Sequence, residues 1–89
     1  MHEIRWKPGA RKRFLSLPKR VRDAMERRID TLAVNPRPPG CRKMTGYEAL
    51  YRIRCGEYRV VYEIRDYALV VLIIWVGPRG DAYKTLGAT

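Results

Sequence analysis

Three arginines stand at spacings that bring them together if the surrounding chain forms a β-hairpin. Arg52 and Arg54 alternate with other residues, and Arg59 follows a Gly56-Glu57 pair that is typical of a two-residue hairpin turn. In that register Arg54 lies opposite Arg59, with Cβ atoms about 4.5–5.5 Å apart. Two guanidiniums at that distance repel each other, and a bound anion relieves the repulsion. The spacing therefore predicts a phosphate site on one face of the hairpin.

The same arginines also have a simpler interpretation as exposed side chains that lie over apolar neighbours. In that case they form surface ion pairs with Glu48, Glu57 or Glu63 and contribute little to function. The spacing alone does not separate these two interpretations.

A further arginine and a tyrosine follow the last apolar run. Arg79 lies in the glycine-rich corner 77–80, and Tyr83 lies four residues later, which is about one helical turn. Positive charge nearby favours the ionised form of a phenol, so Tyr83 is a candidate proton acceptor. The alternative is that Tyr83 packs its ring on the sheet and that Arg79 is a solvated loop residue.

The charge balance points to a polyanionic partner. Nineteen Lys and Arg residues oppose nine Asp and Glu, a formal charge of +10, and fourteen of the nineteen are arginine. Arginine binds phosphate in a planar, bidentate manner that lysine does not match. Many of these residues fall on the expected helices, namely Arg11, Lys12, Arg13, Lys19, Arg20, Arg22, Arg27 and Arg28. They are most simply a solvated face, and they also suffice to hold nucleic acid non-specifically.

The rare residues exclude several functions. One histidine, His2, and two cysteines, Cys41 and Cys55, are too few for a zinc site of conventional spacing, so no metal or other cofactor is expected. The longest apolar run, residues 68–76, is nine residues long, whereas a membrane-spanning helix needs about 20. The sequence also begins without a secretory leader pattern. We expect a cytoplasmic protein with reduced thiols and no membrane contact.

Hydrophobic periodicity predicts the elements that must position the arginines. A strand is expected over 2–6, a helix over 8–16 that starts with Pro8, and a second helix that runs from Pro18 to Asn35. The Pro/Gly-rich residues 35–46 are expected to form a loop. Three strands follow over 50–55, 58–64 and 68–76, the last covered on both faces, and a short tail ends the chain over 81–86.

This order predicts a two-layer α+β sandwich in which a strand and two helices precede a three-stranded antiparallel meander. A chain of 89 residues fits a single domain, 1–89. Most aromatic residues lie in apolar patterns and are expected in the core, namely Trp6, Phe14, Tyr62 and Trp75. Tyr47 and Tyr51 lie beside basic residues and are able to stack on unpaired bases.

Two segments of the chain resemble the RelE branch of the RelE/ParE toxin superfamily. The first is 51–64, YRIRCGEYRVVYEI, and the second is 76–83, VGPRGDAY. The similarity extends to 43–46, KMTG, and to the two basic helices, so it covers nearly the whole chain. It depends on an ordered series: basic-x-basic, then Gly-x-Tyr-Arg-x-x-Tyr, then Gly-x-Arg with a tyrosine four residues later.

The resemblance implies roles for individual residues. Arg59 resembles the family's phosphate-binding arginine and Arg79 its second catalytic arginine, while Tyr83 resembles the tyrosine that orients or deprotonates the 2′-hydroxyl. Arg52 and Arg54 match positions that serve the leaving group and the RNA backbone. Lys43 resembles a basic residue that enters the site, and Arg42 and Tyr51 are expected to contact RNA beside it.

The resemblance also implies an activity and partners. It implies a type II toxin that acts as a metal-independent endoribonuclease on mRNA in the ribosome, with rRNA contacts through the basic helices, and that is silenced by a cognate antitoxin in a hetero-oligomer. The alternatives are a ParE-like inhibitor of DNA gyrase without catalytic activity and a catalytically degenerate toxin. The last is suggested by Pro78, which stands where many relatives carry a possible proton donor, and Thr45 replaces an arginine of some members.

Overall fold

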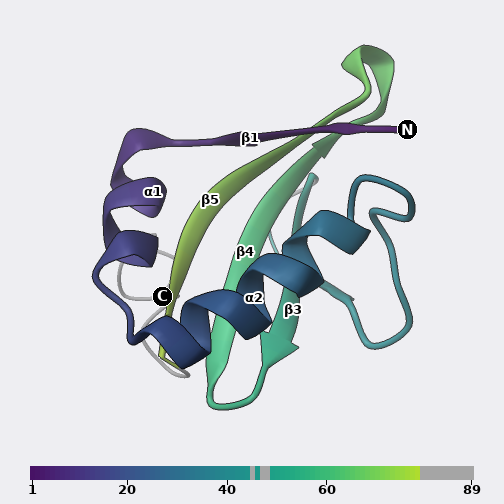
Figure 1. The fold of residues 1–89 in the computed structure, drawn as a ribbon. Helices are drawn as coiled ribbons and strands as arrows, with labels where there is room; N and C mark the ends of the chain where they lie inside the picture. The colour runs from purple at the N-terminus through teal and green to yellow at the C-terminus, as the bar shows by residue number, and fades with distance from the viewer. Residues whose placement is uncertain (45, 47–48, 79–89) are drawn as a thin grey trace.

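The computed structural model describes residues 1–44, 46 and 49–78, which form two layers (Figure 1). Two helices, α1 (Pro8–Leu15) and α2 (Lys19–Thr31), pack on one side of a sheet. The strands are β1 (Glu3–Trp6), β2 (Arg42–Lys43), β3 (Leu50–Cys55), β4 (Tyr58–Arg65) and β5 (Val70–Pro78), and a short 3-10 helix, η1 (Asp66–Ala68), joins β4 to β5. The predicted α+β class and the order of its elements are confirmed.

The sheet is mixed, with the strand order β1-β5-β4-β3-β2. The strands β3, β4 and β5 form the predicted antiparallel meander, whereas β1 runs parallel to β5 and places Ile4 opposite Val71. The strand β5 lies between β4 and, as far as Ile73, β1, and its side chains are buried in apolar clusters on both faces of the sheet. This position fits the unbroken apolar run of its sequence.

The prediction that residues 35–46 form only a loop is wrong. This segment contains β2, in which Arg42 pairs with Arg52 and Lys43 pairs with Tyr51. Both β2 residues are exposed, so the strand buries no apolar side chain and has no alternating pattern that the sequence could reveal.

The ends of two elements also differ from expectation. The helix α2 ends at Thr31, because Ala33 and Val34 donate backbone hydrogen bonds to carbonyls only three residues back, which tightens the last turn. The last strand covers 70–78 instead of 68–76. Its start is delayed by η1, and its end is extended because Gly77 and Pro78 still pair with Arg59 and Tyr58.

The hairpin between β3 and β4 has the predicted register. Gly56 adopts a φ of +61°, which the first central residue of a type II′ turn requires and which glycine adopts without strain. Cys55 consequently lies opposite Tyr58, and Arg54 lies opposite Arg59. The turn therefore fixes which residues share each face of the sheet.

Apolar residues are buried on both faces of the sheet. The main core lies under the helices and includes Met25 and Ile29 of α2, each at most 1% exposed. A smaller cluster on the other face contains Met44, Val61 and Trp75. A β-bulge lies beside this cluster. Val61 pairs with Trp75 but Tyr62 pairs with Ile73, so Ile74 has no partner on β4. The Ile74 side chain packs against the cluster.

Polar contacts hold the segment after α2 against the sheet. The Tyr62 hydroxyl donates a hydrogen bond of 2.7 Å to the Pro36 carbonyl. The Arg37 guanidinium donates to Asp66 at 2.9 Å and to the Tyr51 hydroxyl at 3.3 Å. His2 lies 3.1 Å from the other Asp66 carboxylate oxygen. These contacts tie the N-terminus, the segment after α2 and η1 together at one end of the sheet.

Replacing Tyr62 with phenylalanine should lower the free energy of unfolding by about 1 kcal/mol, because the Pro36 carbonyl loses its donor in a half-buried place. Burial raises the pKa of the Tyr62 hydroxyl, so this group remains a protonated donor over the whole working range of pH. Urea denaturation measures the change. Tyr67→Phe is the control, because the Tyr67 side chain is 88% exposed, and it should leave the stability unchanged. Equal free energies of unfolding for Tyr62→Phe and the wild type would show that the hydrogen bond from Tyr62 to Pro36 does not stabilise the fold.

The stability should also depend on the charge of Asp66 in acid. Hydrogen bonds from Arg37, and secondarily from His2, lower the pKa of Asp66. The stabilisation from this carboxylate is therefore present above its unfolded pKa of about 3.9 and is lost as the pH falls through the lower folded pKa. Melting temperatures of the wild type and Asp66→Asn should differ above about pH 5 and converge below about pH 4. A difference that persists unchanged at pH 2 would refute this linkage.

Candidate phosphate-binding site

The candidate site begins with the arginine pair that the hairpin register creates. Arg54 and Arg59 are direct cross-strand partners on β3 and β4, as predicted. Arg52 lies two residues before Arg54 and shares its face of the sheet. Ile53, between them, points into the core under the helices. The three arginines therefore lie on the sheet face that the helices leave uncovered.

The unpredicted strand β2 adds a fourth arginine. Arg42 pairs with Arg52 across β2 and β3, and residues directly opposite each other in an antiparallel pair share a face. Arg42, Arg52, Arg54 and Arg59 thus lie on three adjacent strands, and we call them the arginine face. Such a concentration of guanidiniums is what a phosphate-binding surface requires.

A small cavity of about 30 Å³ lies within this surface. It is lined by Arg42, Arg52 and Arg54 together with Gly40 and Ile53. A volume of that size holds a water molecule or one small polar group. The hollow therefore suits a single oxygen of an anion rather than a whole nucleotide.

The members of the arginine face differ in burial. Arg59 is only 9% exposed, whereas Arg42 and Arg54 are exposed. Arg59 lies on β4, the middle strand of the five, between Arg54 of β3 and Gly77 of β5. Its guanidinium stays charged because arginine is not deprotonated in proteins. Arg59 is therefore a buried positive charge. The exposed Arg54 and Arg42 lie on the next two strands, β3 and β2, toward the edge of the sheet.

One of the predicted ion-pair partners is already engaged elsewhere. The Glu63 carboxylate forms an ion pair with Arg65. Within the part of the chain that the structure describes, neither Arg42 nor Arg54 takes part in an ion pair. Glu48, another expected partner, lies outside the described residues. The simpler interpretation as a set of surface ion pairs thus receives no support for these two arginines.

Two residues expected to contact RNA lie on the other face. Tyr51 packs against the main core, with its ring centroid 6.1 Å from that of Tyr62, and its hydroxyl accepts a hydrogen bond from Arg37. Lys43 pairs with Tyr51 and so projects to the same side. The structure therefore brings Arg42, Arg52, Arg54 and Arg59 together and separates Lys43 and Tyr51 from them.

The expected catalytic residues Arg79 and Tyr83 lie outside the described residues. Gly77, however, pairs with Arg59, and only Pro78 separates Gly77 from Arg79 in the sequence. The described chain thus ends beside the arginine face.

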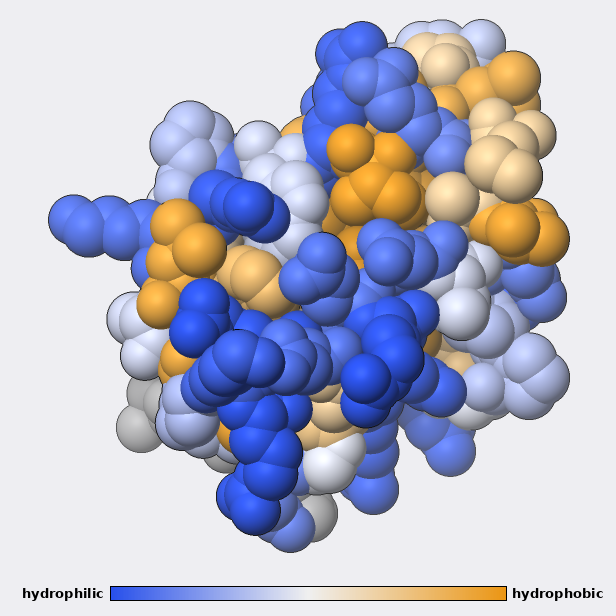
Figure 2. All heavy atoms as spheres, viewed as in Figure 1, coloured by the Kyte–Doolittle hydropathy of each residue, from blue (hydrophilic) through white to orange (hydrophobic). Residues whose placement is uncertain are grey.

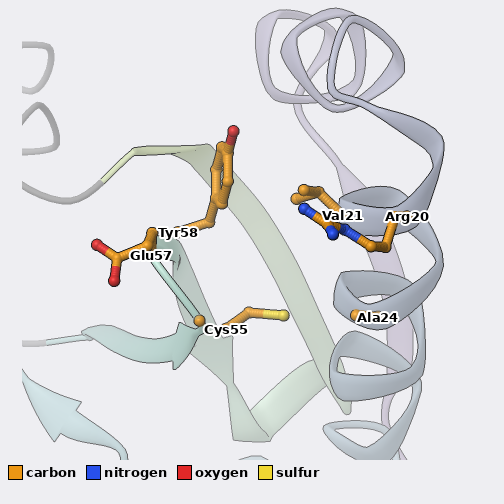
Figure 3. A pocket seen from close by; sticks show the side chains of 7 residues that line it. Arg20, Val21, Ala24, Cys55, Glu57 and Tyr58 are labelled. Carbon is orange, nitrogen blue, oxygen red and sulfur yellow. The ribbon is translucent and has the colours of Figure 1, made fainter.

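Two larger hollows lie between α2 and the hairpin. One of about 310 Å³ has a mostly apolar wall that includes Val21, Ala24, Cys55 and Tyr58 (Figure 3). The Cys55 side chain points toward α2, and burial raises the pKa of its thiol, which disfavours the reactive thiolate. The second hollow, of about 500 Å³, is bordered by Arg27, Arg28 and Arg54. Figure 2 shows that hydrophilic residues cover much of the surface over α2, the helix that contributes Arg27 and Arg28 to this hollow.

Sequence reasoning missed the position of Arg13. It was expected on a solvated helix face, but its Nε donates a hydrogen bond of 2.9 Å to the Val76 carbonyl of β5. Its guanidinium carbon lies 5.0 Å from the centroid of the Trp75 ring. No local pattern around residue 13 indicates this contact, because it depends on where β1 ends.

The described part of the chain contains neither a metal-binding cluster nor a membrane-spanning helix. Among residues 1–44, 46 and 49–78, no three His, Cys, Asp or Glu side chains gather where they could hold a metal ion. None of the helices in these ranges is long and apolar enough to cross a membrane.

The fold, with two helices on one side of a five-stranded sheet, is that of the toxins of the RelE/ParE superfamily. A family model described as ParE toxin of type II toxin-antitoxin system, parDE, matches residues 4–83, and the chain belongs to this family. A RelE-like toxin protein of Escherichia coli is 25% identical over 87 residues, which cover 93% of this chain and 90% of that protein.

Solved structures support the RelE branch of the superfamily. RelE in the archaeal RelE-RelB complex from Pyrococcus horikoshii is 30% identical with a TM-score of 0.78, and the match covers 89% of this chain and 96% of that chain. RelE in the intact RelBE complex of E. coli is 28% identical, also with a TM-score of 0.78, over 88% of this chain and 96% of that chain. The resemblance inferred from the sequence is thus confirmed.

Proposed function

We propose that this chain is a RelE-like endoribonuclease that cleaves mRNA on the ribosome. The 2′-hydroxyl of one ribose attacks the adjacent phosphorus. The bond from phosphorus to the 2′-oxygen forms as the bond to the 5′-oxygen breaks, which leaves a 2′,3′-cyclic phosphate and a 5′-hydroxyl. The 2′-hydroxyl loses its proton to a base, for which Tyr83 is our candidate, and the departing 5′-oxygen gains one.

The gathering of Arg42, Arg52, Arg54 and Arg59 on one sheet face is the observation that carries this proposal. In the transition state extra negative charge develops on the phosphate oxygens, and preorganised donors stabilise it. One such donor is typically worth about 10²–10³ in rate. Arg59 and Arg79 would bind the reacting phosphate, and Arg52 and Arg54 would serve the leaving group and the RNA backbone.

The remaining predicted contacts have roles away from the reacting phosphate. We assign Arg42 to the RNA backbone at the sheet edge and Lys43 to RNA on the other side of that edge, whereas Tyr51 is held by Tyr62 and Arg37 and receives no RNA contact. The basic residues of the helices would bind rRNA, and the ribosome would hold the mRNA in line for attack. The arginine set supplies the charge that other nucleases take from a metal ion, so the proposal requires no metal.

A cognate antitoxin is the expected partner. Solved relatives are complexes of RelE with RelB. A chain of charge +10 is best covered by an acidic segment that is flexible before binding. We therefore propose a toxin–antitoxin hetero-oligomer in the cytoplasm, in which the antitoxin masks basic surface.

Induction of the chain in bacterial cells, followed by mapping of mRNA 5′ ends, tests this function. The double variant Arg59→Ala, Arg79→Ala serves as the comparison. Codon-phased cuts that disappear in the variant would support the nuclease. DNA damage without new RNA ends would instead indicate a gyrase inhibitor, and a folded wild type without toxicity would indicate a degenerate toxin.

A further inference from the structure

Arg13 caps a part of the sheet edge that no strand covers. The parallel pairing of β1 with β5 ends where Trp6 meets Ile73. Beyond Ile73, the outer edge of β5 therefore lacks a neighbouring strand among the described residues. The Arg13 side chain reaches this edge from α1 and donates its Nε hydrogen to the Val76 carbonyl. The same guanidinium lies over the Trp75 ring, 5.0 Å from its centroid.

The position of Arg13 relative to Gly77 brings it to the arginine face. A Cβ atom built on Gly77 would lie 2.9 Å from the Arg13 Nη2 atom, so this nitrogen lies directly against the glycine. Gly77 pairs with Arg59 on its other side. The Trp75 ring lies over Gly77 as well, with two atoms 2.6 Å from the same Cβ position, and Arg13 lies over that ring. Arg13 thus continues the row of guanidiniums from β2, β3 and β4 past β5.

The guanidinium of Arg13 is both oriented and available. Its Nε donates to the Val76 carbonyl, and its planar face lies over the Trp75 ring. These two contacts fix the direction of the two terminal nitrogens. The side chain is exposed, and no carboxylate of the described residues forms an ion pair with it. An oriented and exposed guanidinium of this kind suits a monoanionic oxygen.

We propose that Arg13 binds a backbone phosphate of the RNA next to the phosphate that Arg59 binds. This inference rests on the proposed function, since the anion is taken to be RNA. The contact extends the binding surface from the sheet to α1. Neighbouring helix residues do not share the geometry: Arg11 lies over the Trp6 and Phe14 rings, at 5.2 and 5.6 Å from their centroids.

Salt-dependent binding of RNA tests the contact separately from cleavage. The probe is a single-stranded RNA oligonucleotide with 2′-O-methyl riboses, which lack the attacking hydroxyl. We expect Arg13→Gln to bind about tenfold more weakly than the wild type at low salt. The slope of log affinity against log salt should also shrink by about 0.7, the value for one phosphate contact on a single strand. Arg13→Lys keeps the charge and should keep the slope.

Matched variants distinguish a contact made by Arg13 from a general effect of positive charge on α1. Lys7→Gln removes one exposed charge from the residue just before α1 and should leave the slope nearly unchanged. If Lys7→Gln lowers the slope as much as Arg13→Gln, or if Arg13→Gln keeps the wild-type slope, the Arg13 contact is refuted. A wild type that does not bind the oligonucleotide at all would also refute the contact, whereas the proposed function is tested separately by the mapping of mRNA 5′ ends. Melting temperatures show whether each variant is folded.

Discussion

Replacing Arg59 with alanine should lower the rate of RNA cleavage about 10²–10³-fold, the usual cost of removing one preorganised donor from a transition state. Arg59 is the most buried of the described charged side chains and lies on the middle strand of the sheet. Its guanidinium is therefore held in place before the substrate arrives. Single-turnover cleavage of mRNA on purified ribosomes measures the effect on the rate.

Two further variants make this result specific. Arg5→Ala removes an exposed arginine of β1 that is ion-paired with Glu3, and it should keep the wild-type rate. Arg59→Lys retains a charge but loses the planar fork, so we expect it to lie between the wild type and Arg59→Ala. Circular dichroism verifies that each variant is folded. A folded Arg59→Ala that cleaves within threefold of the wild type would show that Arg59 is not a phosphate ligand.

Replacing Gly77 with alanine should lower the free energy of unfolding by about 1–3 kcal/mol, which is the usual cost of overpacking. The added Cβ would lie 2.6 Å from two atoms of the Trp75 ring and 2.9 Å from the Arg13 Nη2 atom. Trp75 is 2% exposed, so its ring has little room to move. Because Gly77 pairs with Arg59, a shift of this strand should also slow cleavage. Urea denaturation measures the stability.

Gly9→Ala is the matched control for this change. Gly9 lies in the first turn of α1, and a Cβ there would meet nothing within 4 Å. Alanine is favoured over glycine in helices, so this variant should equal or exceed the stability of the wild type. If Gly77→Ala is as stable as Gly9→Ala, the packing around Trp75 is not as close as described.

Local patterns predicted the features of the fold that depend on neighbours in the sequence. The alternation of residues 50–55 and the Gly56-Glu57 turn were sufficient to place Arg54 opposite Arg59. The spacing of Met25, Ile29 and Leu32 likewise identified the buried side of α2. These signals are strong because a turn or a helix fixes its own register without help from the rest of the chain.

Features that depend on distant strands could not be predicted in this way. The pairing of Arg42 with Arg52 joins a loop to a strand, and two exposed residues give no hydrophobic pattern. The contact between Arg13 and Val76 exists because β1 stops at Trp6 and leaves the edge of β5 open. Each of these contacts requires knowledge of the strand order.

Tyr51 shows that a local pattern can conflict with a functional expectation. Alternation placed Tyr51 on the face opposite Arg52 and Arg54, whereas the neighbouring arginines suggested that it stacks on RNA bases. The structure follows the alternation, because Tyr51 stacks on Tyr62 and contacts Arg37 under the helical layer. Proximity in the sequence was therefore a poor guide to proximity in space.

The chemical groups at the cut ends of a defined mRNA test the central claim most directly. Ribosomes that carry one mRNA are incubated with the purified chain, and the new ends are analysed by mass spectrometry. Arginine-assisted attack by the 2′-hydroxyl predicts a 2′,3′-cyclic phosphate upstream of the cut and a 5′-hydroxyl downstream, both lost in Arg59→Ala. Downstream ends that carry a 5′-phosphate, or mRNA that stays intact with the folded wild type, would contradict the proposed reaction.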